Sequence, residues 1–167
     1  SVPKPVQGSW VALCHDDKGR IIVSDQFGGL YRFNPPAPGK TLKASDIETV
    51  PAKIRAANGL LWADDALYVA VNDYERKFPS GLYRVTDSNG DDKLDKVELF
   101  REMFARGDHG VHAVLPGPKN TLYLITEKVY SIRYIAPCWK HVDNIALNPK
   151  CSSVKIDVIT LVLNVRQ

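Results

Sequence analysis

The sequence lacks the features that mark several common classes of protein. Its 167 residues include 22 Lys and Arg and 19 Asp and Glu, a balance too even to indicate a nucleic-acid partner. No segment is long and apolar enough to span a bilayer, and the sequence contains no signal-peptide pattern. Phosphate loops, dinucleotide fingerprints and Gly-x-Ser-x-Gly motifs are absent as well. What remains is a globular protein, whose apolar fraction of 44% permits a buried core.

Cysteine is scarce. Cys14, Cys138 and Cys151 follow no zinc spacing and form neither a Cys-x-x-Cys pair nor a Cys-x-x-Cys-His haem motif. We therefore expect no haem site in this chain and three ordinary thiols, although Cys138 and Cys151 could pair in an oxidising compartment.

What the sequence does contain is an internal repeat. Each unit has an apolar stretch, a polar turn and a second, β-prone stretch: residues 10–13 with 21–23, 59–62 with 67–71, and 111–115 with 122–125. The turns carry Asp, Gly, Pro or Asn, which is typical of β-hairpins. A third strand is expected in each unit, because Gly-Leu-Tyr-Arg at 29–32 recurs at 81–84 and more loosely at 129–133. A fourth, outer strand is predicted at 96–101, where apolar and charged residues alternate.

Three or four short strands per roughly 50 residues is the size of a propeller blade. We therefore predict an all-β fold, a partial β-propeller of about three blades of antiparallel strands. A sandwich of short strands is the alternative, but successive strands of a sandwich have no reason to repeat a tetrapeptide. Propeller rings have about four to eight blades, so this chain either belongs to a longer protein or associates with other copies of itself.

The acidic segment 87–98 has the spacing of a calcium-binding loop. Oxygen-bearing side chains occupy loop positions 1, 3, 5, 9 and 12, as in EF-hands, where alternate residues face one hard cation. Position 7 would supply its backbone carbonyl. The predicted ligands are Asp87, Asn89, Asp91, Lys93, Asp95 and Glu98. Position 6, usually a Gly that makes a sharp turn, is Asp92 here, and the alternative is a solvated hairpin loop built on Asx-turns.

Two further pairs of residues are candidates for ligand contact. His109 and His112 open the third unit, where a His could act as a base, bind a ligand or form a structural hydrogen bond. Joint metal binding by the two is awkward, because residues three apart on an extended chain face different ways. Asp25 and Asp73 each follow the second strand of a unit, where they could hydrogen-bond a ligand or cap a turn.

Together these segments resemble the N-terminal propeller of the membrane-bound dehydrogenases of planctomycete-type bacteria. The resemblance covers roughly residues 8–128 and is carried by residues 23–32, by Gly-Leu-Tyr-Arg at 81–84 leading into the acidic loop, and by His-Gly-Val-His-Ala at 109–113. It implies an exported, six-bladed propeller related to quinoprotein glucose and sorbosone dehydrogenases, which oxidise sugars or alcohols. By the same resemblance His112 and His109 would be catalytic, and a quinone such as PQQ would serve in the full-length parent. We assign Asp25 and Asp73 as cofactor-binding candidates.

Residues 129–167 depart from this pattern. The first 128 residues hold 17 basic and 17 acidic side chains, so the whole net charge of +3 lies in the remainder. We therefore predict two regions: a partial propeller over 1–128, and a divergent, β-prone tail over 129–167. The apolar run at 154–165 would be either a divergent blade strand or the product of a frameshift.

The functional prediction follows from these regions. We expect a fragment of an exported dehydrogenase-like propeller that is stabilised by calcium and inactive by itself, because catalysis needs an enclosed site. Its expected partners are a sugar or alcohol ligand, the remaining blades or a haem domain of a longer parent, and further copies of the chain. The alternative is a non-enzymatic module that binds glycans or protein partners.

Overall fold

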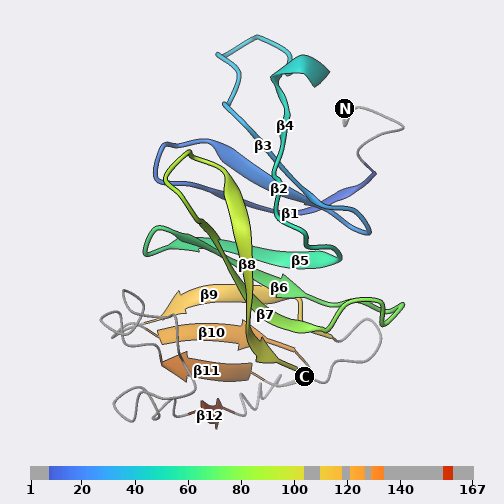
Figure 1. Cartoon of the computed structure of the whole chain (residues 1–167), viewed down its shortest axis with the longest axis vertical. Helices are drawn as coiled ribbons and strands as arrows, with labels where there is room; N and C mark the ends of the chain where they lie inside the picture. The colour runs from blue at the N-terminus through green and yellow to red at the C-terminus, as the bar shows by residue number, and fades with distance from the viewer. Residues whose placement is uncertain (1–7, 104–109, 118–120, 127–128, 134–155, 160–167) are drawn as a thin grey trace, which may run out of the picture.

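The computed structural model describes residues 8–103, 110–117, 121–126, 129–133 and 156–159, and the structural statements below concern these residues. They form three four-stranded antiparallel sheets (Figure 1). Within each sheet, the strands are hydrogen-bonded in the order in which they follow along the chain. The predicted all-β class is thereby confirmed. The described residues contain no α-helix, and their one helical element is the short 3-10 turn η1 (Ala44–Asp46).

The first sheet consists of β1 (Trp10–His15), β2 (Ile21–Asp25), β3 (Leu30–Phe33) and β4 (Glu48–Thr49). Its first turn is built by Asp16, whose Oδ1 accepts the backbone N–H groups of Lys18 (3.0 Å) and Arg20 (2.8 Å). Gly19 adopts a φ of +75° in this turn, which glycine does at little steric cost. The Asp-Asp-Lys-Gly sequence therefore forms the hairpin that it predicts.

The second sheet consists of β5 (Ala57–Ala63), β6 (Ala66–Val71), β7 (Gly81–Asp87) and β8 (Leu94–Glu102). Asp64 and Asp65 connect β5 to β6 with φ values of +48° and +54°. Positive φ at both central residues matches the right-handed twist of the flanking strands, as in type I′ hairpins. The predicted outer strand is confirmed as β8.

The third sheet consists of β9 (Ala113–Gly117), β10 (Thr121–Ile125), β11 (Val129–Arg133) and β12 (Ile156–Ile159). β11 pairs with β10, and β12 pairs with β11. Both strands lie beyond residue 128, where the predicted tail begins, and they complete the third sheet. Most of the tail lies outside the described residues, so its assignment as a separate region stays a prediction.

The three sheets repeat the same cross-strand row of paired residues. In the first sheet Leu13 pairs with Val23, which pairs with Tyr31. The corresponding rows are Leu60, Val69 and Tyr83 in the second sheet and Val114, Leu124 and Tyr130 in the third. Each row therefore runs from an apolar residue on the first strand to a Tyr on the third. The sequence repeat is a structural repeat as well.

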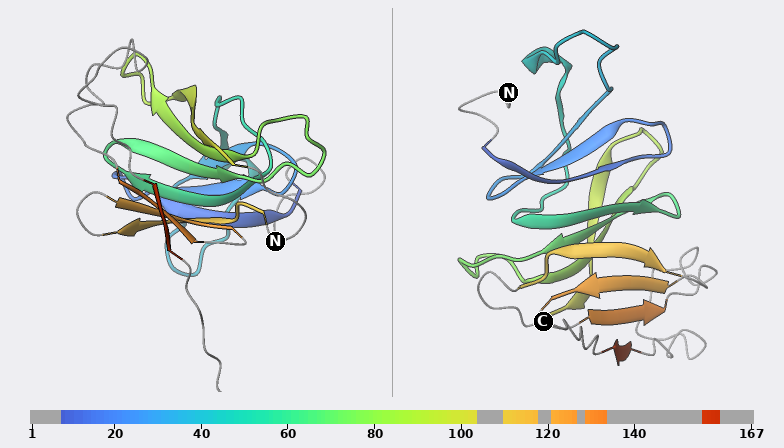
Figure 2. Two further views of the ribbon diagram at one scale, coloured as in Figure 1. Left: turned by 90° about the horizontal axis from the view of Figure 1, so that it is seen from below. Right: turned by 180° about the vertical axis from the view of Figure 1, so that it is seen from behind.

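The sheets are stacked so that their first strands lie near one another: β1 lies beside β5, and β5 beside β9 (Figures 1 and 2). Two apolar clusters fill the spaces between the sheets. Successive residues of β6 alternate between them, because side chains of a strand point to opposite faces. Leu67 and Val69 belong to the cluster shared with the first sheet, and Tyr68 and Ala70 to the cluster shared with the third. The inner strand β6 is thus buried on both faces.

No helix among the described residues is both long and apolar enough to cross a membrane.

Candidate functional site

The predicted calcium loop begins at the last residue of β7 and runs through the first half of β8. Asp87 pairs with Leu94 in the ladder, so the two strands close the loop at its base. Leu94 is 3% exposed and belongs to the apolar cluster between the first two sheets. The apolar residue at loop position 8 therefore fixes the loop to the core, as its position in the sequence indicates.

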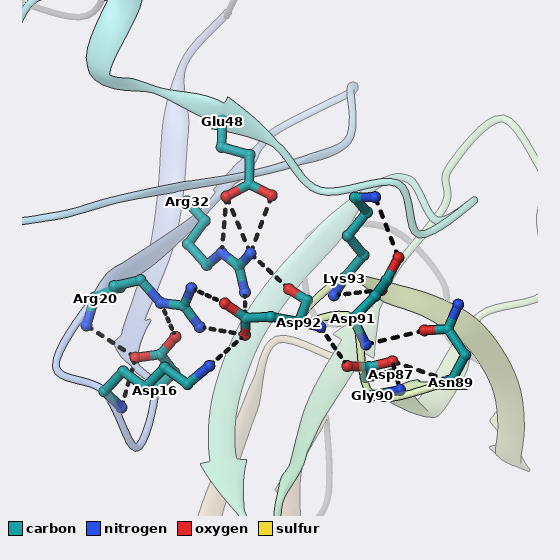
Figure 3. Close-up of polar contacts among 11 residues, drawn as sticks. Asp16, Arg20, Arg32, Glu48, Asp87, Asn89, Gly90, Asp91, Asp92 and Lys93 are labelled. Carbon is teal, nitrogen blue, oxygen red and sulfur yellow. Dashed lines mark hydrogen bonds and ion pairs between the residues drawn. The ribbon is translucent and has the colours of Figure 1, made fainter.

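The loop is organised by side-chain carboxylates that accept backbone N–H groups (Figure 3). Asp87 Oδ1 accepts from Asn89 (3.0 Å) and Gly90 (2.7 Å), and its Oδ2 accepts from Asp92 (2.6 Å). These bonds, that from Asn89 first, hold the pKa of Asp87 below its usual range. Asn89 Oδ1 accepts from Asp91, and Asp91 Oδ1 accepts from Lys93, at 3.0 and 3.1 Å. Loop positions 1, 3 and 5 thus form successive Asx-turns.

The two predicted ligands on β8 have other partners. Asp95 accepts the hydroxyl (2.8 Å) and the backbone N–H (2.9 Å) of Ser88, and these bonds, the hydroxyl's first, lower its pKa. Glu98 lies opposite Arg84 in the ladder, 3.6 Å from its guanidinium and 3.1 Å from the Lys96 ammonium. Asp95 therefore belongs to the loop, while Glu98 lies on the neighbouring stretch of strand among basic side chains.

Position 6 is the point at which the sequence departs from the usual calcium loop. Asp92 adopts a φ of +67° itself, and Gly90 adopts +81°. Left-handed backbone is unfavourable for most side chains, but Asp is among the residues that tolerate it. The sharp turn is thus made without Gly at position 6.

The Asp92 side chain binds the first sheet. Arg20 Nη2 donates to its Oδ1 (2.8 Å), the Lys18 ammonium lies 2.9 Å from the same oxygen, and Arg32 donates to the Asp92 backbone carbonyl (2.8 Å; Figure 3). The hydrogen bond from Arg20 and then that from Lys18 hold the pKa of Asp92 far below its usual range. Arg20 in turn donates through Nε to the buried Asp16 (2.7 Å). We call Asp16, Lys18, Arg20, Arg32 and Asp92 the inter-sheet network.

Sequence reasoning missed this network. In the sequence, Asp92 stands out only as a departure from Gly, and Arg32 only as the last residue of a recurring tetrapeptide. The Asp at position 6 is itself a signal of such a network. A charged side chain at a position where Gly is usual needs a partner that compensates for the unfavourable backbone conformation. The sequence did not show which distant arginine would provide it.

The donor set of the loop suits calcium in part. Hard carboxylate, amide and carbonyl oxygens are the ligands that calcium takes, and positions 1, 3, 5, 7 and 9 of the turn supply them. Among the described residues, however, no three His, Cys, Asp or Glu side chains are gathered around one point. Asp87, Asn89, Asp91, Asp95 and the Lys93 carbonyl fit the role of ligands, and Glu98 would have to leave its basic neighbours to join them.

Asp25 and Asp73 are both largely buried and cap their own turns. Asp25 is 8% exposed and its Oδ1 accepts the N–H groups of Phe27 (3.0 Å) and Gly28 (3.1 Å). A Cβ added at Gly8 or Gly28 would lie within 2.7 Å of the Asp25 carboxylate, so these glycines enclose it. Asp73, 5% exposed, accepts the N–H of Glu75 (3.0 Å). Both have the turn-capping geometry that is one of the two expected roles, and their role in cofactor binding stays a prediction.

His112 is exposed just before β9, and His109 lies outside the described residues. The His112 backbone N–H donates to the Ile125 carbonyl (3.1 Å), and its ring Nδ1 lies 2.6 Å from the Gly110 carbonyl. A carbonyl only accepts, so Nδ1 carries the proton, and Nε2 is the basic nitrogen of the neutral ring. The role of His112 as a catalytic base stays a prediction.

Cys14 and His15 form no nucleophilic pair. Burial, followed by the nearby Asp16 carboxylate, raises the pKa of the Cys14 thiol to about 12. His15 Nδ1 lies 3.1 Å from the Asp16 backbone oxygen. The thiol therefore stays protonated at neutral pH, whereas a catalytic thiol is lowered in pKa.

We compared the chain with known proteins, and no protein-family model, no curated protein and no solved structure matches it.

Proposed function

We propose that this chain is a blade-forming segment of a β-propeller with a structural calcium loop, belonging to an exported, dehydrogenase-like protein. One observation carries the propeller proposal. The cross-strand row formed by Leu13, Val23 and Tyr31 recurs in all three sheets, and the first strands of these sheets lie side by side. Blades of a propeller are four-stranded sheets arranged around an axis that their first strands line. A sandwich of two sheets would give neither feature.

The calcium proposal rests on the turn formed by Asp87, Asn89 and Asp91. Their side chains, together with Asp95 and the Lys93 carbonyl, would hold the ion, which would offset the repulsion between neighbouring carboxylates. Since Asp92 of the same turn binds the first sheet, an ion there would stiffen the contact between two sheets. The role is structural.

Thermal unfolding in calcium and in chelator tests this proposal. At a calcium concentration one hundred times the dissociation constant, binding to the folded chain alone adds about 2.7 kcal/mol to the free energy of unfolding. Asp91→Asn should reduce the calcium-dependent rise in Tm, because it removes one ligand charge. Asp17→Asn is the matched control, since Asp17 is an exposed carboxylate in another hairpin turn. Equal Tm values for the unaltered chain in both conditions would contradict the calcium site.

The dehydrogenase proposal concerns the longer parent. It rests on the resemblance of segments 23–32, 81–84 and 109–113, and on the exposed ring of His112. His112 Nε2 would accept the proton that leaves the hydroxyl of a sugar or alcohol, while a bound quinone would supply the oxidising chemistry. Reduction of a dye by the quinone-loaded parent, dependent on sugar or alcohol and lost in His112→Gln, is the expected result.

A second candidate function is glycan binding without chemistry. Phe27 (60% exposed) and Tyr74 (49% exposed) follow the second strands of adjacent sheets, next to Asp25 and Asp73. Exposed aromatic rings offer a flat apolar surface with hydrogen-bonding groups nearby. Oligosaccharide binding that is lost in Phe27→Ala and needs no quinone would favour this candidate over oxidation.

A further inference from the structure

Leu13 is much more exposed to solvent than the residues at the same position in the other two repeats. It occupies the same place in the first sheet as Leu60 in the second and Val114 in the third, each paired with the second residue of the repeated row. Leu60 is 8% exposed and Val114 is 3% exposed, whereas Leu13 is 69% exposed. Val11 on the same strand is 44% exposed. Apolar side chains on the first strand of this sheet are thus exposed, whereas Val23 and Tyr31, the other two residues of the row, are 2% and 9% exposed.

In the second and third sheets, the residues equivalent to Leu13 are buried because a neighbouring sheet packs against them. Leu60 and Val69 pack against the first sheet, in the cluster that includes Ile22. Val114 and Leu124 pack against the second sheet, in the cluster that includes Tyr68. Ile22 and Tyr68 are equivalent, because they pair with Cys14 and Leu61, the residues that follow Leu13 and Leu60. The face that bears Ile22 in the first sheet therefore covers the face that bears Leu60 in the second. In the same way, the face that bears Tyr68 in the second sheet covers the face that bears Val114 in the third.

At the other end of the stack, Leu115 of the third sheet occupies the position that Cys14 and Leu61 have in the first two sheets. Leu115 pairs with Tyr123, as Cys14 pairs with Ile22 and Leu61 with Tyr68. Cys14 and Leu61 pack against the clusters between sheets, but Leu115 is 49% exposed. The two ends of the stack thus carry complementary surfaces, which we call the Leu13 face and the Leu115 face.

We propose that two copies of this chain associate head to tail, with the Leu13 face of each copy against the Leu115 face of the other. Each new contact would repeat a packing of faces that the chain already uses twice, so the apolar surfaces would be buried as those of Leu60 and Val114 are. Two stacks of three sheets joined in this way form a closed set of six, within the roughly four to eight blades of propeller rings. Closure removes both free faces, whereas open head-to-tail addition would continue into a filament.

This inference rests on the proposed blade architecture and goes beyond it by naming the partner. It differs from a symmetric contact in which two Leu13 faces meet. In a head-to-tail pair both faces take part, so an alteration at either end weakens association. In a symmetric contact only one of them matters.

Molar mass by light scattering, over a range of protein concentrations, tests the pairing. The unaltered chain is expected at twice its monomer mass of 18.6 kDa. Leu13→Asp and Leu115→Asp should each shift the mass to that of one chain, because a charge would be buried in the contact. Leu99→Asp is the matched control: Leu99 is 43% exposed on β8, away from both faces, and its variant should remain a dimer.

Mixing the two single variants gives a sharper result. A pair of one Leu13→Asp chain and one Leu115→Asp chain has one contact without any alteration, so the mixture should partly recover the dimer mass. A Leu115→Asp chain that remains dimeric would indicate the symmetric contact and overturn the proposal. A monomer mass for the unaltered chain at all concentrations would overturn it as well. A monomer that calcium still stabilises would leave the proposed calcium loop intact, so the two failures can be told apart.

Discussion

Arg20 and Asp92 are 72 positions apart in the sequence, and their side chains form a bidentate pair between the first and second sheets, at 2.5 and 2.8 Å. Arg20 lies at the end of a hairpin turn, and Asp92 lies in the acidic loop with a φ of +67°. Paired charges in this fork geometry fix orientation as well as distance. The loop is therefore attached to two sheets, through Leu94 in the core and Asp92 at the surface.

Removing the charge of Asp92 should weaken the contact between the two sheets. Asp92→Asn keeps the size of the side chain and a residue type that tolerates positive φ, but loses the ionic pairing. The side chain of Asp92 is 44% exposed, so solvent screens the pair and we expect a loss of only about 1 kcal/mol. Urea unfolding in chelator measures it, with Asp17→Asn as the control. A loss of equal size in both variants would mean that the inter-sheet network contributes nothing specific.

Acid should destabilise the fold through the same loop. The pKa values of Asp87, Asp92 and Asp95 are all lowered in the folded chain, so the unfolded chain binds more protons as the pH falls. Their contribution to stability is complete above the unfolded pKa of about 3.9 and is lost as the pH falls toward the folded values. Unfolding free energies between about pH 6 and 2 should fall toward acid, less steeply in Asp92→Asn. A flat profile over this range would contradict the assignment.

A methyl group at Gly59 should force the second and third sheets apart. A Cβ at this position would lie 2.8 Å from the Ala113 Cα and 3.0 Å from the His112 backbone oxygen, and neither can move without the strand. Overpacking of this kind costs about 1–3 kcal/mol. At Gly29 the nearest atom to such a Cβ is 3.9 Å away, so Gly29→Ala is the control. Denaturant midpoints compare the two, and similar values for both variants would show that the sheets are not held this closely.

Much of the fold could be predicted from the sequence, because the repeat places its signals locally. The Gly-Leu-Tyr-Arg segments and the Asp-rich turns each predict a strand or hairpin from residues that are close together in the sequence. The strands β3, β6 and β7 lie where these segments predict them. The spacing of Asp87, Asn89 and Asp91 predicts a calcium loop, with a hairpin loop built on Asx-turns as the alternative, and the structure shows the Asx-turns. The pairing of Asp92 with Arg20 depends on how two sheets stack, and no local pattern encodes that relation. The presence of an ion in the turn stays a prediction.

The burial of β6 on both faces sets an order for local opening of the molecule. A strand whose two faces are both covered, as β6 is, can lose its hydrogen bonds only after a neighbouring sheet has moved away. In stacked repeats each unit depends mainly on its nearest neighbours, so the terminal units are the weakest. Amide protons of Leu67, Val69 and Val71 would therefore exchange with solvent last, and any early unfolding intermediate would keep its structure in the centre and lose it from the ends.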